Sequence, residues 1–277
     1  MNQIHPRYQH TLDDLFLHVF VLIDDFLQPF EPHLPRQAHQ KASISEILTI
    51  AIVGEILAQP YESVWYWLVK QNHQDLFPSL PHPSRYHRIL RNSEQLIAQL
   101  ALSVTAEQSG IELIDSKPLP VAKGKRASWA KLPEAMKGFS TMGMVFGFKL
   151  HALVSEVGLF RRWMFAPANC SDVRAGRELT QDSEGDVVLG DKAYVGSDVI
   201  TPAKKNMHDQ GRWCSWMSRA RKRIETSFSS LVRSLIPKDR AQRTLHASQV
   251  KTFRSLRTRV NLKIAAFNLM HSGALNG

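Results

Sequence analysis

Residues 111–120, IELIDSKPLP, are the stretch that decides how this chain folds. Their apolar run is typical of a buried strand, and Asp115 follows where that run ends. The same pattern recurs at residues 186–196, DVVLGDKAYVG, where Asp191 follows a second short apolar run. Because such strand ends can lie side by side in one sheet, the two patterns predict a pair of neighbouring carboxylates.

A third acidic residue, Glu225, lies in residues 219–231, RARKRIETSFSSL, which have the apolar spacing of an amphipathic helix. A helix packed on the sheet would bring Glu225 to the two aspartates. Three carboxylates suit a pair of Mg²⁺ ions, which neutralise the attacking and leaving oxygens of a phosphodiester. Taken singly, each aspartate is explained as well by a turn cap, and Glu225 by an ion pair with Arg221.

Charge is distributed unevenly along the chain. Residues 1–110 hold 7 Lys and Arg against 11 Asp and Glu, whereas residues 111–277 hold 28 against 14. The net charge of +10 therefore arises in the part that carries the three acids. A polyanion such as DNA is the simplest partner for this asymmetry. Charge alone leaves an acidic protein partner, or a solvated basic surface, equally open.

The composition is that of a globular protein, with 43% hydrophobic and 22% charged residues. Cys170 and Cys214 have neither metal-ligand spacing nor a disulfide framework, which favours a reducing compartment. The first residues lack the basic-then-apolar pattern of a signal peptide, and the most apolar stretch, residues 44–57, is too short to cross a bilayer. We therefore expect a cytoplasmic protein with no membrane association.

The N-terminal region is expected to be all helical. Ser43 and Glu46 form a capping-box pattern before a nearly continuous apolar run. Helices are expected in residues 11–27, 43–58, 61–71 and 92–108, the last two separated by the Pro-rich residues 77–91. Such short helices fit a helix-turn-helix and fit equally a plain supporting or dimerisation region.

The remainder of the chain alternates strand and helix patterns. A hairpin is expected around Val157–Gly158, a capped helix in residues 169–180, a short strand at residues 199–202, and two long helices at about 218–236 and 247–270. This order predicts a mixed α/β sheet flanked by helices. His151, within the expected hairpin, is interpreted as a buried core histidine rather than a metal ligand.

Basic residues near the acids are the candidate DNA contacts. Residues 117–142 are expected to form a long connection, and a long connection in a compact domain is often functional. Phosphate contacts are expected from basic side chains, and base stacking from one tryptophan in that connection. The candidates are Lys117, Lys123, Lys125, Arg126, Trp129, Lys192, Arg221, Arg223 and Arg233.

The ordered motifs around the three acids resemble the DDE transposases of bacterial insertion sequences, and in particular insertion-sequence family 982. The resemblance rests on the motifs IDSKPLPV, GFSTMG, FGFKLHA, the Pro-x-Asn-x-x-Asp segment Pro167–Asp172, LGDKAYVG and RKRIETSFSSL. Any one of these motifs is weak evidence, whereas six in the same order are specific. They cover residues 105–272, and the N-terminal region more loosely.

The resemblance implies a ribonuclease-H-like catalytic domain at residues 107–272, preceded by the helical residues 1–106 and followed by a tail at 273–277. It implies that Asp115, Asp191 and Glu225 bind two Mg²⁺ ions, for which Mn²⁺ can substitute. The implied reaction is cleavage at the ends of the element, followed by attack of the freed 3′-OH on target DNA. The implied partners are double-stranded DNA and a second copy of the chain, in a bacterial nucleoid.

Two departures from the pattern keep other functions open. Related families carry Tyr-x2-Arg-x3-Glu-x6-Lys around the last acid, whereas this chain has Ser218 and Val232 at the Tyr and Lys positions. The connection from Asp191 to the strand at 199–202 is also shorter than a usual crossover. The alternatives are a catalytically inactive, transposase-derived DNA-binding protein and a structure-selective nuclease of the same fold.

Overall fold

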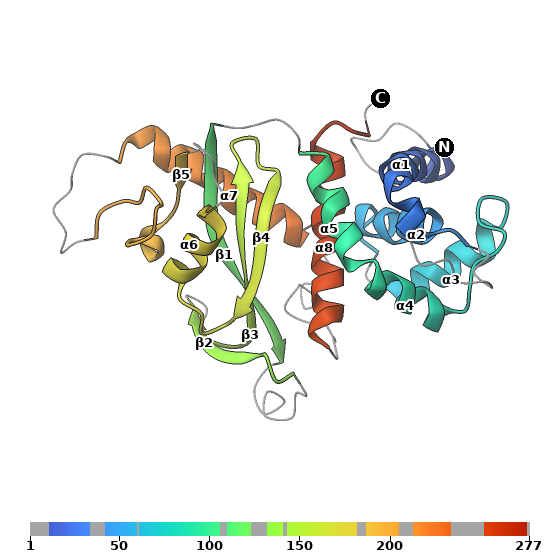
Figure 1. Cartoon of the computed structure of the whole chain (residues 1–277), viewed down its shortest axis with the longest axis horizontal. Coiled ribbons are helices and arrows are strands. Elements are labelled where there is room, and N and C mark those ends of the chain that lie inside the picture. Colours follow the sequence, from blue (N-terminus) through green and yellow to red (C-terminus); the bar gives the residue numbers. More distant parts are fainter. Residues whose placement is uncertain are drawn as a thin grey trace. The chain divides into compact units, whose positions relative to one another are not determined.

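The computed structural model describes residues 11–33, 42–59, 61–105, 110–122, 132–140, 143–181, 187–204, 213–233 and 252–275. These residues form two compact units (Figure 1). A helical unit takes the described part of residues 1–104 and the described residues from Arg254 onward. A sheet unit takes the described part of residues 105–233 together with residues 252 and 253.

The helical unit confirms the expected N-terminal helices. It contains α1 (Leu12–Leu27), the 3₁₀ helix η1 (Gln28–His33), α2 (Ile44–Ile56), α3 (Glu62–Asn72), α4 (Pro83–Asn92), α5 (Glu94–Ser103) and α8 (Phe253–His271). The Ser43–Glu46 capping box is present at the start of α2. The Pro-rich residues 77–91 were expected only to separate two helices, but they contain most of α4, which begins at Pro83. Proline is tolerated in the first turn of a helix because an N–H group there has no partner within the helix.

Helix α8 differs from its expected place. The sequence interpretation assigned it to the catalytic domain, but its polar side chains are bonded within the helical unit. Asn268 Nδ2 donates to the Ala101 carbonyl oxygen at 2.8 Å, and Lys263 Nζ lies 2.7 Å from Glu55 Oε2 in a largely buried ion pair. Because hydrogen bonds of buried groups are directional, these contacts fix α8 against α2 and α5.

The sheet unit is built around one long strand. β1 (Ile111–Ala122) pairs antiparallel with β3 (Gly143–Ser155) and parallel with β5 (Val187–Leu189). β3 pairs in turn with β2 (Met136–Ser140) through its first residues and with β4 (Phe160–Pro167) through its later ones. The described strands thus form a five-stranded mixed sheet, which confirms the predicted mixed α/β sheet.

The predicted hairpin and the predicted short strand have different outcomes. β3 and β4 form the hairpin, and Gly158 takes a φ of +96° in its turn, a conformation that favours glycine. At residues 199–202 only Ile200 joins the sheet, through an isolated parallel bridge to Leu189. The segment between these bridge partners holds a single 3₁₀ turn, η3 (Lys192–Tyr194), in place of a crossover helix.

Two helices cover opposite faces of the sheet. Helix α6 (Asp172–Thr180) contributes Leu179 to a buried cluster with Ile114 and Leu153, so the side chain of Ile114 points toward α6. Asp115 is the next residue in the strand and therefore points to the other face, where α7 (Ser215–Arg233) contacts β1. Figure 1 shows α6 in front of the strands and α7 passing behind them.

Candidate active site

The two aspartates occupy equivalent positions on adjacent parallel strands. The β1–β5 register pairs Ile111 with Val187 and ends with Leu113 opposite Leu189. Asp115 and Asp191 each lie two residues beyond that last pair. Because alternate residues of a strand share one face, Asp115 points to the same face as Leu113. The expectation that the aspartates lie side by side agrees with this register.

The sequence interpretation was wrong about where β1 stops. Asp115 was expected at the end of a strand, but β1 continues to Ala122 and Asp115 pairs with Ala152 of β3. Only the pairing with β5 ends before Asp115. The continuing strand holds Asp115 rigidly, whereas Asp191 lies at the start of a turn, where its Oδ1 accepts a hydrogen bond from Ala193 N at 2.9 Å.

Helix α7 brings Glu225 to the same site. Ile224, Phe228 and Leu231 are buried at helical spacing, and Phe228 packs edge-to-face on Phe160 at a ring distance of 5.6 Å. The hydroxyl of Ser227 donates to the Gly158 carbonyl oxygen at 2.8 Å, which ties α7 to the β3–β4 turn. Glu225 lies at the margin of this buried stripe, and half of its side chain is exposed.

The electrostatics of Asp115 respond to both of the other acids. Burial, followed by the negative charges of Asp191 and Glu225, raises the pKa of Asp115 from 3.8 to about 6. A hydrogen bond from the Ser116 N–H and the positive charge of Arg221 oppose these effects. Arg221 also pairs with Glu225 at 2.8 Å. A carboxyl group held in this way near two like charges is one that a cation would stabilise.

These carboxylates fit a divalent metal by their chemistry. In the described part of the chain, no group of three His, Cys, Asp or Glu side chains has an arrangement that could hold a metal ion. The candidate donors are nevertheless all carboxylate oxygens, which Mg²⁺ and Mn²⁺ prefer. Burial is the largest cause of the raised pKa of Asp115, and a bound cation would offset both this cost and the repulsion from Asp191 and Glu225.

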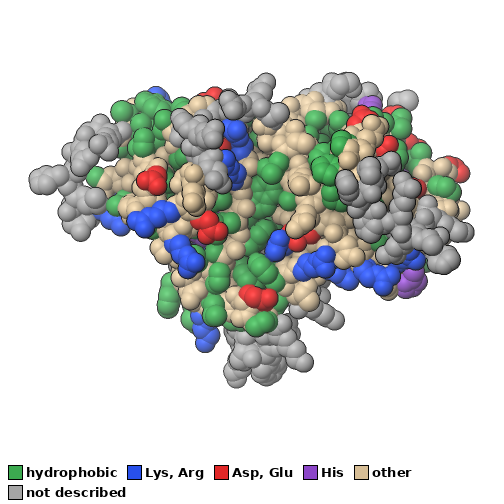
Figure 2. Space-filling model, viewed as in Figure 1, with side chains coloured by type: hydrophobic (Ala, Val, Ile, Leu, Met, Phe, Trp, Pro, Cys, Tyr) green, Lys and Arg blue, Asp and Glu red, His purple; other side chains and the backbone are tan. Residues whose placement is uncertain are grey.

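The candidate DNA-binding residues differ in exposure, and several lie outside the described residues. Lys192 in η3 and Arg223 in α7 are exposed, Lys117 is half-buried within β1, and Arg221 pairs with Glu225. The candidates Lys123, Lys125, Arg126 and Trp129, together with the side chain of Arg233, lie outside the described residues. On the face drawn in Figure 2, described Lys and Arg side chains lie in several separate groups among apolar and acidic ones.

The expected long connection at residues 117–142 was also wrong. Its first residues belong to β1 and residues 136–140 form β2, which pairs with the start of β3. A set of partly or fully buried polar residues on the other face of the sheet was missed. Ser116, Lys149, Asp172 and Tyr194 surround His151, whose side chain is fully buried, as the sequence interpretation expected. No local pattern in the sequence could have found this set.

Gly190, which precedes Asp191, lies where a side chain has no room. A Cβ atom there would come within 2.7 Å of Val199 Cγ1 and 2.8 Å of Ile114 Cγ2. Replacing Gly190 with alanine should therefore destabilise the sheet unit by about 1–3 kcal/mol, measured by urea unfolding. Gly110→Ala is the matched control, because its Cβ would meet nothing within 4 Å. Equal stability of the two variants would contradict the tight packing beneath Asp191.

Comparison with known families agrees with the division of the chain. A family model described as a transposase DDE domain matches residues 105–254, more than half of the 277 residues. The matched range contains all three acids and ends at the start of α8, as the sheet unit does. Neither the curated proteins nor the solved structures gave a match. No helix in the described ranges is long and apolar enough to cross a membrane.

Proposed function

Because this chain belongs to the transposase DDE domain family, we propose that Asp115, Asp191 and Glu225 are the catalytic acids of a DNA transposase. The observation that carries the proposal is the equal offset of the two aspartates beyond the β1–β5 pairing, with Glu225 acting on Asp115 from α7. The reaction proposed is cleavage at the ends of a mobile element and joining of those ends to target DNA.

The order of the sheet supports a ribonuclease-H-like domain. The central strand β1 has the antiparallel β3–β4 hairpin on one side and the parallel β5 on the other, extended by the bridge at Ile200. The helical unit then serves as an accessory region, for which recognition of the DNA ends and dimerisation are the proposed roles. The motif resemblance makes insertion-sequence family 982 of bacteria the proposed relative within the larger family.

In the proposed mechanism, a different element of the fold holds each acid. Asp115 is held by the strand, Asp191 by the turn that it caps, and Glu225 by a helix whose Arg221 balances its charge. Together they would hold a pair of Mg²⁺ or Mn²⁺ ions, which when bound neutralise the attacking and leaving oxygens of the phosphodiester. With no covalent protein–DNA bond required, catalysis rests on positioning and charge.

The proposed reaction has two steps, and its reactants are water, the element end and the target DNA. In the first, a water oxygen attacks the phosphorus at the element end, the P–O3′ bond breaks, and a 3′-OH is released. In the second, that 3′-OH attacks a phosphorus of the target DNA, and the target's 3′ oxygen leaves. The exposed Lys192 and Arg223 are proposed to contact DNA phosphates beside the acids. Two element ends must be cut together, so a homodimer is the proposed active form.

The test uses the full chain and a plasmid that carries its reading frame with the natural flanking DNA. We expect nicking at the ends of the element that requires Mg²⁺ or Mn²⁺ and stops with EDTA. Recovery of products joined to a second plasmid would demonstrate transposition. Metal-dependent cutting without joining would instead indicate the structure-selective nuclease.

The isolated bridge between Leu189 and Ile200 is the observation that favours a second candidate function. The segment that follows Asp191 has only this bridge to the sheet among the described residues, so the turn that carries Asp191 depends on β5, which precedes it, for its place on the sheet. A catalytically inactive DNA-binding protein would bind the same plasmid tightly, yet neither bind Mn²⁺ nor nick DNA. A calorimetric titration of the intact protein with Mn²⁺ separates this outcome from an active enzyme.

A further inference from the structure

Polar residues on the face of the sheet that α6 covers connect the two segments that carry Asp115 and Asp191. Ser116 directly follows Asp115, so its side chain points to the opposite face of β1. Its hydroxyl donates to Asp172 Oδ1 at 3.1 Å, in the first turn of α6, where the helix dipole favours a carboxylate. Asp115 is thus the immediate neighbour of a residue whose side chain is hydrogen-bonded to α6 on the opposite face of the sheet.

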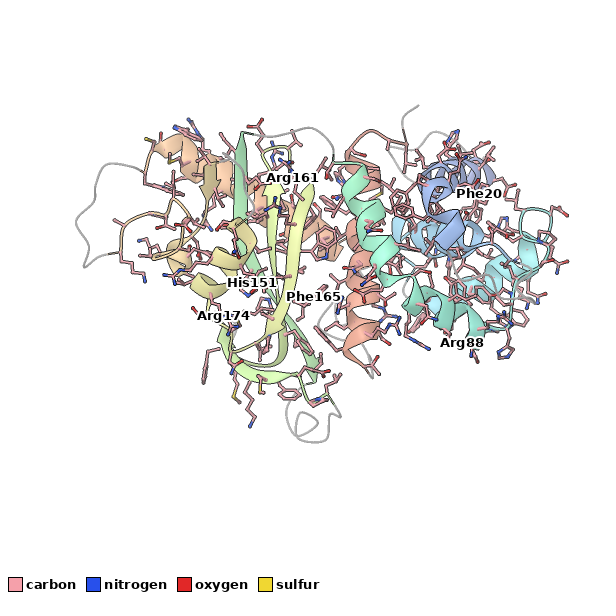
Figure 3. The ribbon with its side chains drawn as sticks, viewed as in Figure 1. Phe20, Arg88, His151, Arg161, Phe165 and Arg174 are labelled. Atoms are coloured by element: carbon pink, nitrogen blue, oxygen red, sulfur yellow. The ribbon has the colours of Figure 1, made fainter. Side chains whose placement is uncertain are left out.

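Asp172 is the centre of this group. Lys149 Nζ lies 3.3 Å from its Oδ1, and His151 Nδ1 lies 3.7 Å from the same oxygen. His151 is fully buried on β3, on the side of the sheet that faces α6 (Figure 3). A buried group of hydrogen-bonded side chains is directional, so it specifies one arrangement of the elements that contribute to it.

Tyr194 brings the turn after Asp191 into the same group. Its side chain is 1% exposed and its ring belongs to the apolar cluster between the sheet and α6. Its hydroxyl lies 3.3 Å from His151 Nδ1, which in turn lies 3.7 Å from the Asp172 oxygen that accepts from Ser116. Tyr194 ends the same 3₁₀ turn that Asp191 caps, so this turn connects Asp191 to the group that contains Ser116.

We infer that Tyr194, through His151 and the Asp172 carboxylate that accepts from Ser116, is a positioning residue that holds Asp191 beside Asp115. The inference rests on the proposed function. Its physical basis is that apolar packing alone is non-directional, whereas a hydrogen bond between the Tyr194 hydroxyl and His151 of β3 fixes how the turn sits on the sheet. This turn needs such an anchor because, after β5 ends at Leu189, the described residues that follow pair with the sheet through an isolated bridge at Ile200.

The test measures Mn²⁺ binding by titration calorimetry on the full chain carrying Tyr194→Phe. The phenylalanine ring keeps the apolar packing and removes only the hydroxyl. Groups that orient a metal's ligands typically contribute 10- to 100-fold to its affinity, so we expect a loss of about tenfold or more. Tyr66→Phe is the matched control, because it removes a buried hydroxyl bonded to the Pro81 carbonyl oxygen in the helical unit. Its Mn²⁺ affinity should equal that of the wild type.

Variants at Ser116 separate positioning from a general loss of stability. Ser116→Ala should weaken Mn²⁺ binding in the same direction, and Ser116→Thr, which keeps a hydroxyl, should restore it. Wild-type affinity in Tyr194→Phe, alongside a lost affinity in Asp191→Ala, would overturn the inference and leave the proposed function standing. Wild-type affinity in Asp191→Ala would overturn both.

Discussion

Asp191→Ala is expected to reduce cleavage of element-end DNA by on the order of 10³-fold, the scale of losing one electrostatic contribution to a transition state. The reason is the position of Asp191, two residues beyond the last β1–β5 pair and level with Asp115 on the neighbouring strand. Removing one donor of the proposed metal pair leaves the charge that develops on the phosphodiester uncompensated. DNA binding should persist, because alanine removes a negative charge that repels phosphate.

The measurement compares nicking rates and DNA affinity on the same protein samples. Asp198→Ala is the matched control, since Asp198 is an exposed acid seven residues further along the chain. It should cleave at the wild-type rate. Full cleavage by Asp191→Ala would remove Asp191 from the site, and loss of DNA binding alongside cleavage would point to a folding defect instead.

The acids could be found from the sequence because each lies in a local pattern. Short apolar runs that end at Asp115 and near Asp191 are visible without knowing what the strands pair with. The parallel register that brings them level is not visible, since it depends on residues 111–113 meeting residues 187–189. Residue type and order therefore predicted which side chains are candidates, and the pairing gave the two aspartates the same offset beyond the last β1–β5 pair.

The length of β1 could not be predicted for a related reason. Pro118 and Pro120 argue against a strand, because proline has no N–H to donate to a ladder. Both are tolerated here because β5 has already ended at Leu189, which leaves the far side of β1 without a described partner at those residues. The long partner β3 supplies the pairing on the near side, and it begins more than twenty residues later in the chain.

The placement of α8 and the polar group around Asp172 depend on still more distant contacts. Asn268 and Lys263 look like ordinary residues of an amphipathic helix, and their partners Ala101 and Glu55 lie in the first part of the chain. Ser116 and Asp172 are likewise separated by dozens of residues. Contacts of this kind carry no local periodicity, so a single sequence indicates the elements but not which unit they join.

Asp115→Asn is expected to make the metal-free protein more stable at pH 8 while abolishing cleavage. Burial, with the charges of Asp191 and Glu225, raises the pKa of Asp115 from 3.8 to about 6 in the folded protein. The unfolded chain therefore releases this proton at a lower pH than the folded one does. The wild type loses stability as the pH rises from about 4 to about 6, and the asparagine variant does not share this loss.

Above pH 6 the advantage of Asp115→Asn should stay constant, on the order of 3 kcal/mol from the size of the pKa change. Urea unfolding in EDTA at several pH values measures it, with the exposed Asp198→Asn as a control that should show no advantage. Added Mn²⁺ should reverse the order, because a cation that binds only the folded wild type stabilises it by mass action. A variant no more stable than the wild type at pH 8 would show that burial and the neighbouring charges do not raise the pKa of Asp115 in the folded protein. A variant stabilised equally by Mn²⁺ would show that the ion binds elsewhere.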